Sequence, residues 1–363
     1  MRRYVGWGLT RDTALDLVEM TRHQYYYEPT GGRPGMPPST HTQFWDGKQF
    51  HWHSNEEVLR QIRRINADPD MDYGYRRMSV ALMLLGYWIN HKKVYRLMQE
   101  QGLLHERPAK VERTYVTYRK VTPQGPLQVL EMDIKYVWVE EHRRYAYILT
   151  ILDTFTRVVL HWSLGYRMTQ VEVKAAWEHI IATHLQTADM LKKGIHIEVR
   201  NDNGPQFLAQ AVQQFFKDNY LHQVFTHPYT PQENGHVESF HAILSKALKN
   251  TTFWTLGQLE QRLILFYEKY NNERLHTGAA YLPPNQFWEL WNENLIDRKV
   301  DSKNRVTFKL KLPYYQLSGN ENRRAVYLPQ SIGQLNNILS FEKRRCVFHK
   351  LMVPNWPLQK AKI

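Results

Sequence analysis

Hydrophobic positions in the first third of the chain follow the spacing of a helix. Between residues 55 and 104 they predict three short helices, at 56–66, 75–85 and 91–101. Asn90 is well placed to cap the third helix, and Gly102 to end it. The residues from Gly86 to Ile89 make the short connection that helix-turn-helix units use.

The third predicted helix has a basic face. His91, Lys92, Lys93 and Arg96 lie among apolar residues, so one face can pack while the other meets phosphates or base edges. A plain helical bundle with a solvated basic face has the same pattern. The spacing alone leaves both interpretations open.

After residue 127 the spacing changes to the alternation of a strand. The side chains at 130, 132, 134, 136 and 138 form one strongly apolar face, and Glu131 and Asp133 fall on the other. Two further apolar runs, 145–152 and 157–164, predict three antiparallel strands.

The elements that follow alternate between helix and strand. We predict helix 170–185, strand 195–200, helix 206–219, strand 222–226, helix 235–250 and a short helix 285–291. Strands followed by such an alternation predict an α/β fold, a mixed sheet with helices on both faces.

Four segments follow from this pattern. Residues 1–53 form an N-terminal segment whose Gly- and Pro-rich stretch, 29–38, is a linker. Residues 54–110 form the helical domain, residues 121–297 the α/β core, and residues 298–363 a small, basic, mostly β module.

Charge is distributed unevenly over these segments. The net charge is +13, with +6 in residues 1–120, −4 in residues 121–297 and +11 in residues 298–363. A basic chain attracts polyanions. An acidic block between two basic ones is typical of an enzyme that holds metal cations rather than of a protein that only coats DNA.

Composition excludes several other classes of protein. The single cysteine, Cys346, excludes an internal disulfide and a zinc site of two cysteines and two histidines. The longest apolar run, 80–89, is half of what a bilayer requires, and the first residues lack the apolar core of a signal peptide. We therefore expect a soluble, cytoplasmic protein with no membrane partner.

Three carboxylates stand at informative places. Asp133 lies inside the first strand, Asp202 just beyond a later strand and Glu238 in the first turns of a helix. Singly they resemble a strand-edge residue, a turn residue and a helix-dipole contact. Together, carboxylates from three separate elements can hold two divalent ions about 3.5–4 Å apart on a phosphodiester.

The sequence around these carboxylates resembles a known family. The blocks Glu131–Ile134, Arg200–Gly204 and Gln232–Phe240 are similar to the three signature blocks of retroviral-integrase-like DDE transposases. Asp202 and Glu238 have 35 residues between them, the spacing of that group.

Further blocks resemble the OrfB-type transposases of bacterial insertion sequences related to the third class. They are Tyr147–Arg157, Tyr270–His276 with Pro284, and Tyr73–Met98, which is similar to the helix-turn-helix before the catalytic core. The resemblance covers roughly residues 54–292. It makes the basic third helix a DNA contact.

This resemblance implies a fold and a chemistry. The fold is an RNase H-like core, 121–297, in which Asp133, Asp202 and Glu238 are catalytic and bind two Mg²⁺ ions, with Mn²⁺ as an alternative. The reaction cleaves the ends of an insertion element and joins the 3′-hydroxyl to target DNA. The implied DNA contacts are Arg76, Arg77, His91, Lys92, Lys93, Arg96, Lys246 and Lys249.

The last two lysines mark a departure from the family. A lysine usually stands seven positions after the catalytic glutamate, where this chain has Ser245, so Lys246 or Lys249 takes over that contact. The resemblance also implies a homo-oligomer at the nucleoid and an upstream-frame DNA-binding protein or fusion.

The same residues also fit two other functions, and two further carboxylates are candidates for the site. A nuclease that cuts without joining, and a domesticated DNA-binding regulator with an inert core, both fit the same domains. Asp153 is better explained as a turn cap than as a fourth ligand, and Glu233 as a residue of a mobile loop.

Overall fold

A computed structural model describes residues 2–28, 38–106, 122–227, 231–302 and 305–317. The chain divides into two units, residues 1–41 and 42–363. The first contains three short helices, α1 (Arg2–Gly6), α2 (Arg11–Leu17) and α3 (Arg22–Tyr26). The predicted linker at 29–38 lies almost wholly outside the described residues.

The remaining elements run from β1 onward. The strands are β1 (His41–Trp45), β2 (Phe50–Ser54), β3 (Tyr87–Trp88), β4 (Val129–Val139), β5 (Arg144–Asp153), β6 (Val159–Gly165), β7 (Ile197–Asn201), β8 (Leu221–Phe225), β9 (Ile296–Val300) and β10 (Val306–Leu310). The helices are α4 (Asn55–Asn66), α5 (Tyr75–Leu84), α6 (His91–Glu100), α7 (Gln170–Ile180), α8 (Pro205–Leu208), α9 (Gln210–Asp218), α10 (Gly235–Leu248), α11 (Leu256–Asn272), α12 (Pro284–Asn292) and α13 (Tyr314–Leu317). A short π-helix, η1, lies at Ile181–Leu185, and two short 3-10 helices, η2 and η3, lie at Pro231–Asn234 and Thr277–Ala279.

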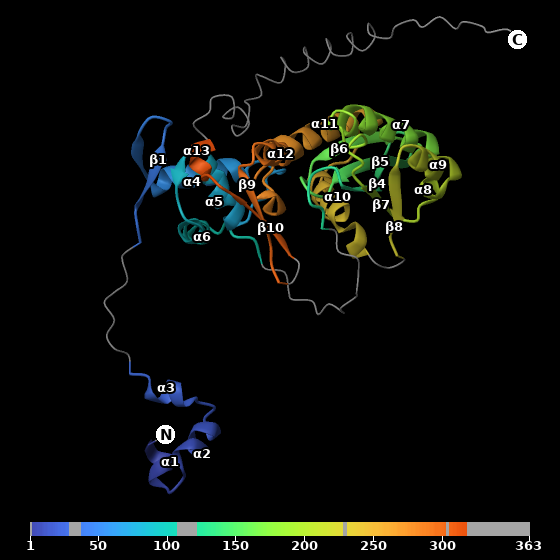
Figure 1. Ribbon diagram of the computed structural model, residues 1–363. Coiled ribbons are helices and arrows are strands. Elements are labelled where there is room, and N and C mark those ends of the chain that lie inside the picture. Colours follow the sequence, from blue (N-terminus) through green and yellow to red (C-terminus); the bar gives the residue numbers. More distant parts are fainter. Residues whose placement is uncertain (1, 29–37, 107–121, 228–230, 303–304, 318–363) are drawn as a thin grey trace, which may run out of the picture. The chain divides into compact units, whose positions relative to one another are not determined.

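A five-stranded sheet with the order β6-β5-β4-β7-β8 forms the centre of the core (Figure 1). β4 pairs antiparallel with β5, and β5 with β6, as the sequence predicts. β7 pairs parallel with β4, and β8 parallel with β7. This mixed sheet is the RNase H-like arrangement, and it places β4, with its two carboxylates, in the middle.

Helices cover both faces of the sheet. Leu130, Met132 and Ile134 of β4 pack in one cluster with Val173 and Trp177 of α7, a cluster that also includes α9. On the other face, Ile148 and Leu152 of β5 pack with residues of α10 and α11. The predicted apolar face of β4 is therefore confirmed for its first half, whereas Tyr136 and Trp138 at its far end are exposed.

The helical domain includes more than its three helices. β1 and β2 form a three-stranded sheet with β3, inside the predicted helix-to-helix link. Gly86 has φ +107°, and a Cβ there would lie 2.4 Å from the Trp45 carbonyl oxygen, so only glycine fits. Residues 41–53 thus pack with the helices, whereas the sequence assigned them to a separate N-terminal segment.

The C-terminal module begins earlier than the sequence predicted and packs with the helical domain. β9 and β10 form a hairpin that begins at Ile296, before the expected boundary at 298. Ile296 and Leu310 belong to the same apolar cluster as Val58 and Leu97 of the helical domain. The β segments predicted beyond residue 317 lie outside the described residues.

Other differences are local. The 17-residue helix α11 was missed, although Leu259, Leu263, Phe266 and Tyr270 recur at helical spacing. The predicted helix 206–219 is two helices, because Ala209 leaves the helical conformation with ψ 128°. Asn90 caps α6 as predicted, since its side chain accepts from the Lys93 N–H.

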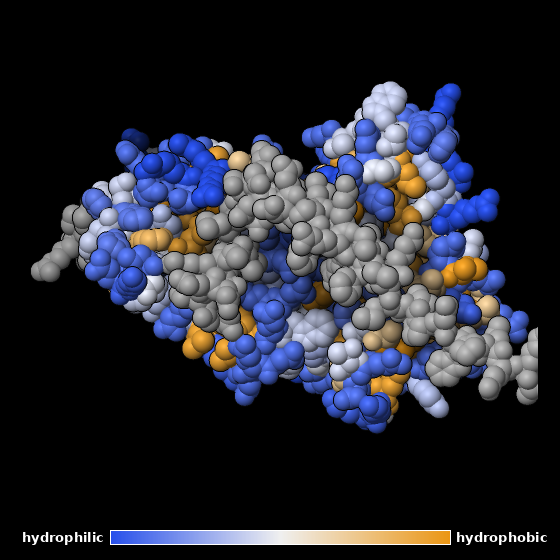
Figure 2. All heavy atoms as spheres, turned by 90° about the horizontal axis from the view of Figure 1, so that it is seen from above, coloured by the Kyte–Doolittle hydropathy of each residue, from blue (hydrophilic) through white to orange (hydrophobic). Residues whose placement is uncertain are grey.

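On the face seen in Figure 2, hydrophilic side chains predominate where the surface is coloured, with hydrophobic patches among them. No helix in the described part of the chain is long and apolar enough to cross a membrane.

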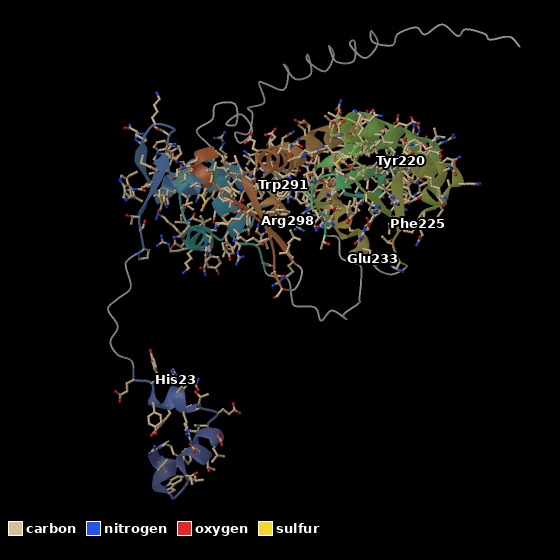
Figure 3. All side chains as sticks on the ribbon, in the orientation of Figure 1. His23, Tyr220, Phe225, Glu233, Trp291 and Arg298 are labelled. Atoms are coloured by element: carbon tan, nitrogen blue, oxygen red, sulfur yellow. The ribbon has the colours of Figure 1, made fainter. Side chains whose placement is uncertain are left out.

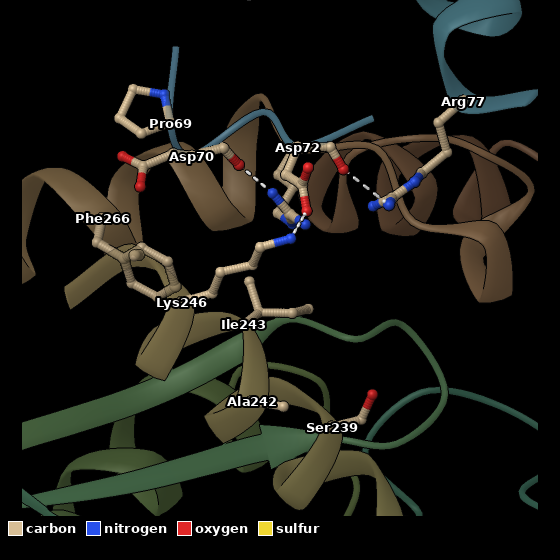
Figure 4. Close-up of a pocket in the computed structure, with 11 residues that line it drawn as sticks. Pro69, Asp70, Asp72, Arg77, Ser239, Ala242, Ile243, Lys246 and Phe266 are labelled. Carbon is tan, nitrogen blue, oxygen red and sulfur yellow. Dashed lines mark hydrogen bonds and ion pairs between the residues drawn. The ribbon is translucent and has the colours of Figure 1, made fainter. Parts of the chain in front are cut away.

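Acidic residues of the helical domain contact basic residues of the core. Asp68 pairs with Lys269 at 2.5 Å, and Asp70 pairs through both oxygens with Arg262, at 2.6 and 3.1 Å. Asp72 pairs with Lys246 of α10. Asp70, Asp72 and Lys246 line a pocket to which α10 also contributes Ser239, Ala242 and Ile243 (Figure 4). The segment 68–72 thus fixes the helical domain to α10 and α11.

Substitution of Asp70 by asparagine tests this interface. Asp70 is only 6% exposed, and removing its charge leaves the Arg262 guanidinium largely buried without a counter-ion. We expect Asp70→Asn to lower the free energy of unfolding by about 3 kcal/mol in urea denaturation. Asp189→Asn, which breaks an exposed pair with Lys192, is the matched control and should cost less than about 1 kcal/mol. Equal effects of the two substitutions would refute the stabilising role of segment 68–72.

Candidate functional site

Two carboxylates of β4 face helix α10. The pleat of β4 places Glu131 and Asp133 on the same side of the sheet, two residues apart. Asp133 is fixed through both oxygens: Oδ1 accepts from the Ile134 N–H at 2.7 Å, and Oδ2 lies 3.1 Å from Nδ1 of His241. The orientation of this carboxylate is therefore set by the protein.

Asp202 comes from the neighbouring strand. β7 runs parallel to β4, with Arg200 opposite Glu131, and Asp202 follows two residues later. Its Oδ1 accepts from the Gly204 N–H at 3.0 Å, the turn contact that the Asp-Asn-Gly sequence predicts. The side chain is exposed, so a substrate can reach it.

Glu238 comes from the first turns of α10, and Glu131 determines where that helix begins. The Glu131 carboxylate, fully buried, accepts from the N–H groups of His236 and Val237 at 2.8 Å each, and from Nδ1 of His236 at 2.7 Å. Free N–H groups at a helix start bind anions well. This anchor, for which the sequence offered no role, holds α10 on β4 and so positions Glu238.

The site carboxylates influence one another. Although both side chains reach solvent, partial desolvation by the surrounding protein and the neighbouring Asp133 charge raise the pKa of Glu238 to about 6, and the same two causes raise the pKa of Asp202. Burial raises the pKa of Glu131 to about 7. The Asp133 charge thus acts on both other sequence-predicted carboxylates.

Their donor chemistry fits a hard divalent cation, since carboxylate oxygens from separate elements are the ligands that Mg²⁺ prefers. A cation would also relieve the repulsion that raises these pKa values. Among the described residues, no three histidine, cysteine or acidic side chains stand close enough to hold an ion as they are.

The other acidic candidates have structural partners. Asp153 is fully buried and accepts from Leu127, Phe155 and Thr156, which supports the predicted turn cap. Glu233 is buried in an η turn near the end of β8, close to Phe225 (Figure 3), and its carboxylate contacts His227 at 2.9 Å. It is therefore not a residue of an open loop.

The predicted DNA contacts differ in accessibility. Arg76, His91 and Lys92 are exposed, as is Lys249 on α10. Lys93 and Arg96 are partly buried, and Lys246 pairs with Asp72. Arg77 donates to the Asp72 carbonyl oxygen at 2.8 Å (Figure 4). Its guanidinium group also lies over the Tyr73 ring. Burial and Arg274 lower its pKa.

Comparison with protein families defines the class. Residues 123–231 and 220–284 match models of the integrase core domain, and residues 53–110 match an HTH-like domain. These domains imply DNA binding and the transfer of polynucleotide strands. Together with the relatives described next, they make the chain similar to proteins of bacterial insertion sequences that carry an integrase core.

The relatives are proteins of insertion sequences, and two of the three described here are named as transposases. The putative transposase InsK for insertion sequence element IS150 of Escherichia coli is 26% identical, over 64% of this chain and 82% of that protein. Transposase InsF for insertion sequence IS3A of Escherichia coli is also 26% identical, over 66% and 83%. A protein of insertion element IS407 of Burkholderia multivorans is 25% identical, over 65% and 82%.

Solved structures with partial similarity are integrase and transposase cores. The HTLV-2 integrase catalytic core domain in complex with magnesium aligns at 20% identity and a TM-score of 0.33, over 46% of this chain and 99% of that one. The catalytic domain of Mos1 mariner transposase aligns at 13% identity and a TM-score of 0.36, over 45% and 74%.

Removal of Glu131 tests the anchor of α10. In Glu131→Ala, two N–H groups at the start of α10 lose their acceptor inside the protein. We therefore expect the free energy of unfolding, measured by urea denaturation, to fall by about 3 kcal/mol. Glu172→Ala is the control, because Glu172 also accepts from a helix-terminal N–H, at Thr169, but on the surface. It should cost about 1 kcal/mol. An equally small effect at Glu131 would contradict its role as the anchor.

Proposed function

We propose that the chain cleaves the ends of an insertion element and joins the freed 3′-hydroxyl to target DNA, with Asp133, Asp202 and Glu238 as its catalytic, metal-binding residues. One observation supports this proposal: Glu131, two residues before Asp133 on β4, accepts from the His236 N–H, two residues before Glu238, and lies opposite Arg200, two residues before Asp202. Two Mg²⁺ ions, or Mn²⁺, would activate the attacking oxygen and stabilise the leaving oxygen.

The protein's own groups place the reactants. The hydrogen bonds to both Asp133 oxygens keep that carboxylate directed toward its neighbours, and the Glu131 anchor holds Glu238 above β4. Asp202 is held by its turn but open to solvent. The phosphodiester needs no covalent protein intermediate, because catalysis rests on placement and on charge neutralisation.

The helical domain would bind the element ends. Exposed Arg76, His91 and Lys92 offer contacts to phosphates or base edges on α5 and α6. We assign residues 54–110 to end recognition and 121–297 to catalysis. Because two ends must be joined, we also propose a homo-oligomer acting at the bacterial nucleoid in the cytoplasm, with an upstream-frame DNA-binding protein or fusion as a further partner.

Cleavage of element-end DNA tests the reaction. Purified protein with Mg²⁺ and oligonucleotides of the DNA ends that flank the gene should give nicked strands and strand-joined products. Glu238→Gln preserves shape but removes one carboxylate, and both products should fall by at least about a thousandfold, as for removal of a group that acts only in the transition state. Ser239→Ala, one position further on α10, is the matched control and should keep both activities.

The alternatives predict other product patterns. Nicking without joined product would favour a nuclease. Binding without nicking, equal in wild type and Glu238→Gln, would favour a DNA-binding regulator with an inert core. Either result, obtained with the upstream-frame protein present, would overturn the proposed function.

Salt dependence tests the role of α6. If Lys92 neutralises a DNA phosphate, Lys92→Gln should reduce the slope of log affinity against log salt by about 1. Lys192→Gln, in the turn before β7, removes an equally exposed lysine and should leave the slope unchanged. Fluorescence anisotropy between about 50 and 200 mM salt measures both. An unchanged slope in Lys92→Gln would remove Lys92 from the DNA interface.

A further inference from the structure

Two histidines of α10 each contact one carboxylate of β4. His236 contacts Glu131 at 2.7 Å, and His241 contacts Asp133 at 3.1 Å, in both cases through Nδ1. Glu238 lies between these histidines in the sequence. The first two turns of α10 are therefore joined to β4 on both sides of the proposed catalytic glutamate.

The two contacts differ in their surroundings. Glu131 is fully buried and already accepts two backbone N–H groups, so His236 adds to an anchor that exists without it. The Asp133 side chain is 22% exposed, and its Oδ2 has His241 as a side-chain partner. His241 itself is 8% exposed, and its Nε2 is buried without a hydrogen-bond partner among the described residues.

We propose that His241 is a positioning residue for the reaction: it donates from Nδ1 to Oδ2 of Asp133 and fixes the carboxylate that the other two proposed ligands face. This inference rests on the proposed function and names a residue that the carboxylate signature does not contain. With Ile134 holding Oδ1, the side chain has no freedom to turn away from Asp202 and Glu238.

The physical reason lies in the repulsion within the site. Asp133 raises the pKa of both other carboxylates, so an unrestrained Asp133 side chain would rotate to increase its distance from them. A hydrogen bond from a helix that is itself anchored at Glu131 opposes that rotation. Partners of this kind orient metal ligands.

Substitution at His241 tests the proposal through metal affinity. Partners that orient ligands contribute about 10- to 100-fold to metal affinity, so His241→Ala should weaken Mn²⁺ binding, measured by calorimetry without DNA, by that factor. His241→Asn places an amide donor near the position of Nδ1 and should restore most of the affinity. Turnover should follow the same order, with KM for DNA unchanged.

His236→Ala is the matched control. It removes the same kind of histidine contact from the same strand and helix, but from a carboxylate outside the proposed ligand set. We expect it to lower stability while leaving Mn²⁺ affinity unchanged. If His241 were only a structural tether, the alanine variants at 236 and 241 would behave alike, and that result would overturn the proposal.

The tautomer of His241 gives a second readout, independent of metal and activity. A donor at Nδ1 requires the proton on that nitrogen, so two-bond ¹H–¹⁵N spectra of the metal-free protein should show His241 protonated at Nδ1. In Asp133→Ala, which has no acceptor at this position, this preference should be lost. Protonation at Nε2 alone in wild type would overturn the proposal.

Failure of this inference can be told from failure of the proposed function. If wild type binds Mn²⁺ and joins DNA while His241→Ala does so equally well, only the role of His241 is wrong. If wild type neither binds Mn²⁺ nor cuts DNA, the proposed function fails, and the positioning role fails with it.

Discussion

The contact between the Glu131 carboxylate and the first N–H groups of α10 determines the geometry of the site. Without it, β4 and α10 would be joined chiefly by apolar contacts, which hold a helix near a sheet but fix neither its rotation nor its start. The carboxylate meets N–H groups that no residue of the helix can satisfy, so position and direction are set together. Every proposed role of Glu238 and His241 depends on this contact.

Most of the sheet could be predicted from the sequence, because the alternation of apolar and polar residues is visible within each strand alone. Alternation along β4 and the apolar runs of β5 and β6 need no tertiary information, and the turn at Asp202 follows from its own three residues. Glu131 was not predicted as an anchor, because its partners lie 105 and 106 residues away and a strand acid is ordinarily exposed. The contact of His241 with Asp133 was not predicted for the same reason, since the two residues are 108 positions apart.

The interface at segment 68–72 changes the interpretation of the charges. The sequence presented Lys246 as a free basic group for DNA and the segment around Arg77 as part of a DNA-binding surface. Asp72 pairs with Lys246, and Arg77 turns toward Tyr73, so part of that basic charge joins the helical domain to the core. Net charge per segment could not reveal this, because acids and bases that pair across a boundary are counted on opposite sides of it.

The proposed catalytic carboxylates contribute little to holding the fold together. Asp202 and Glu238 are exposed and repelled by Asp133, so their ionised forms are disfavoured where they stand. The polar contacts that stabilise the same region belong to other residues: Glu131 anchors α10, Asp153 caps the turn after β5, and Glu233 holds His227. Because these neighbours fix the backbone, like charges can be kept close together without opening the structure.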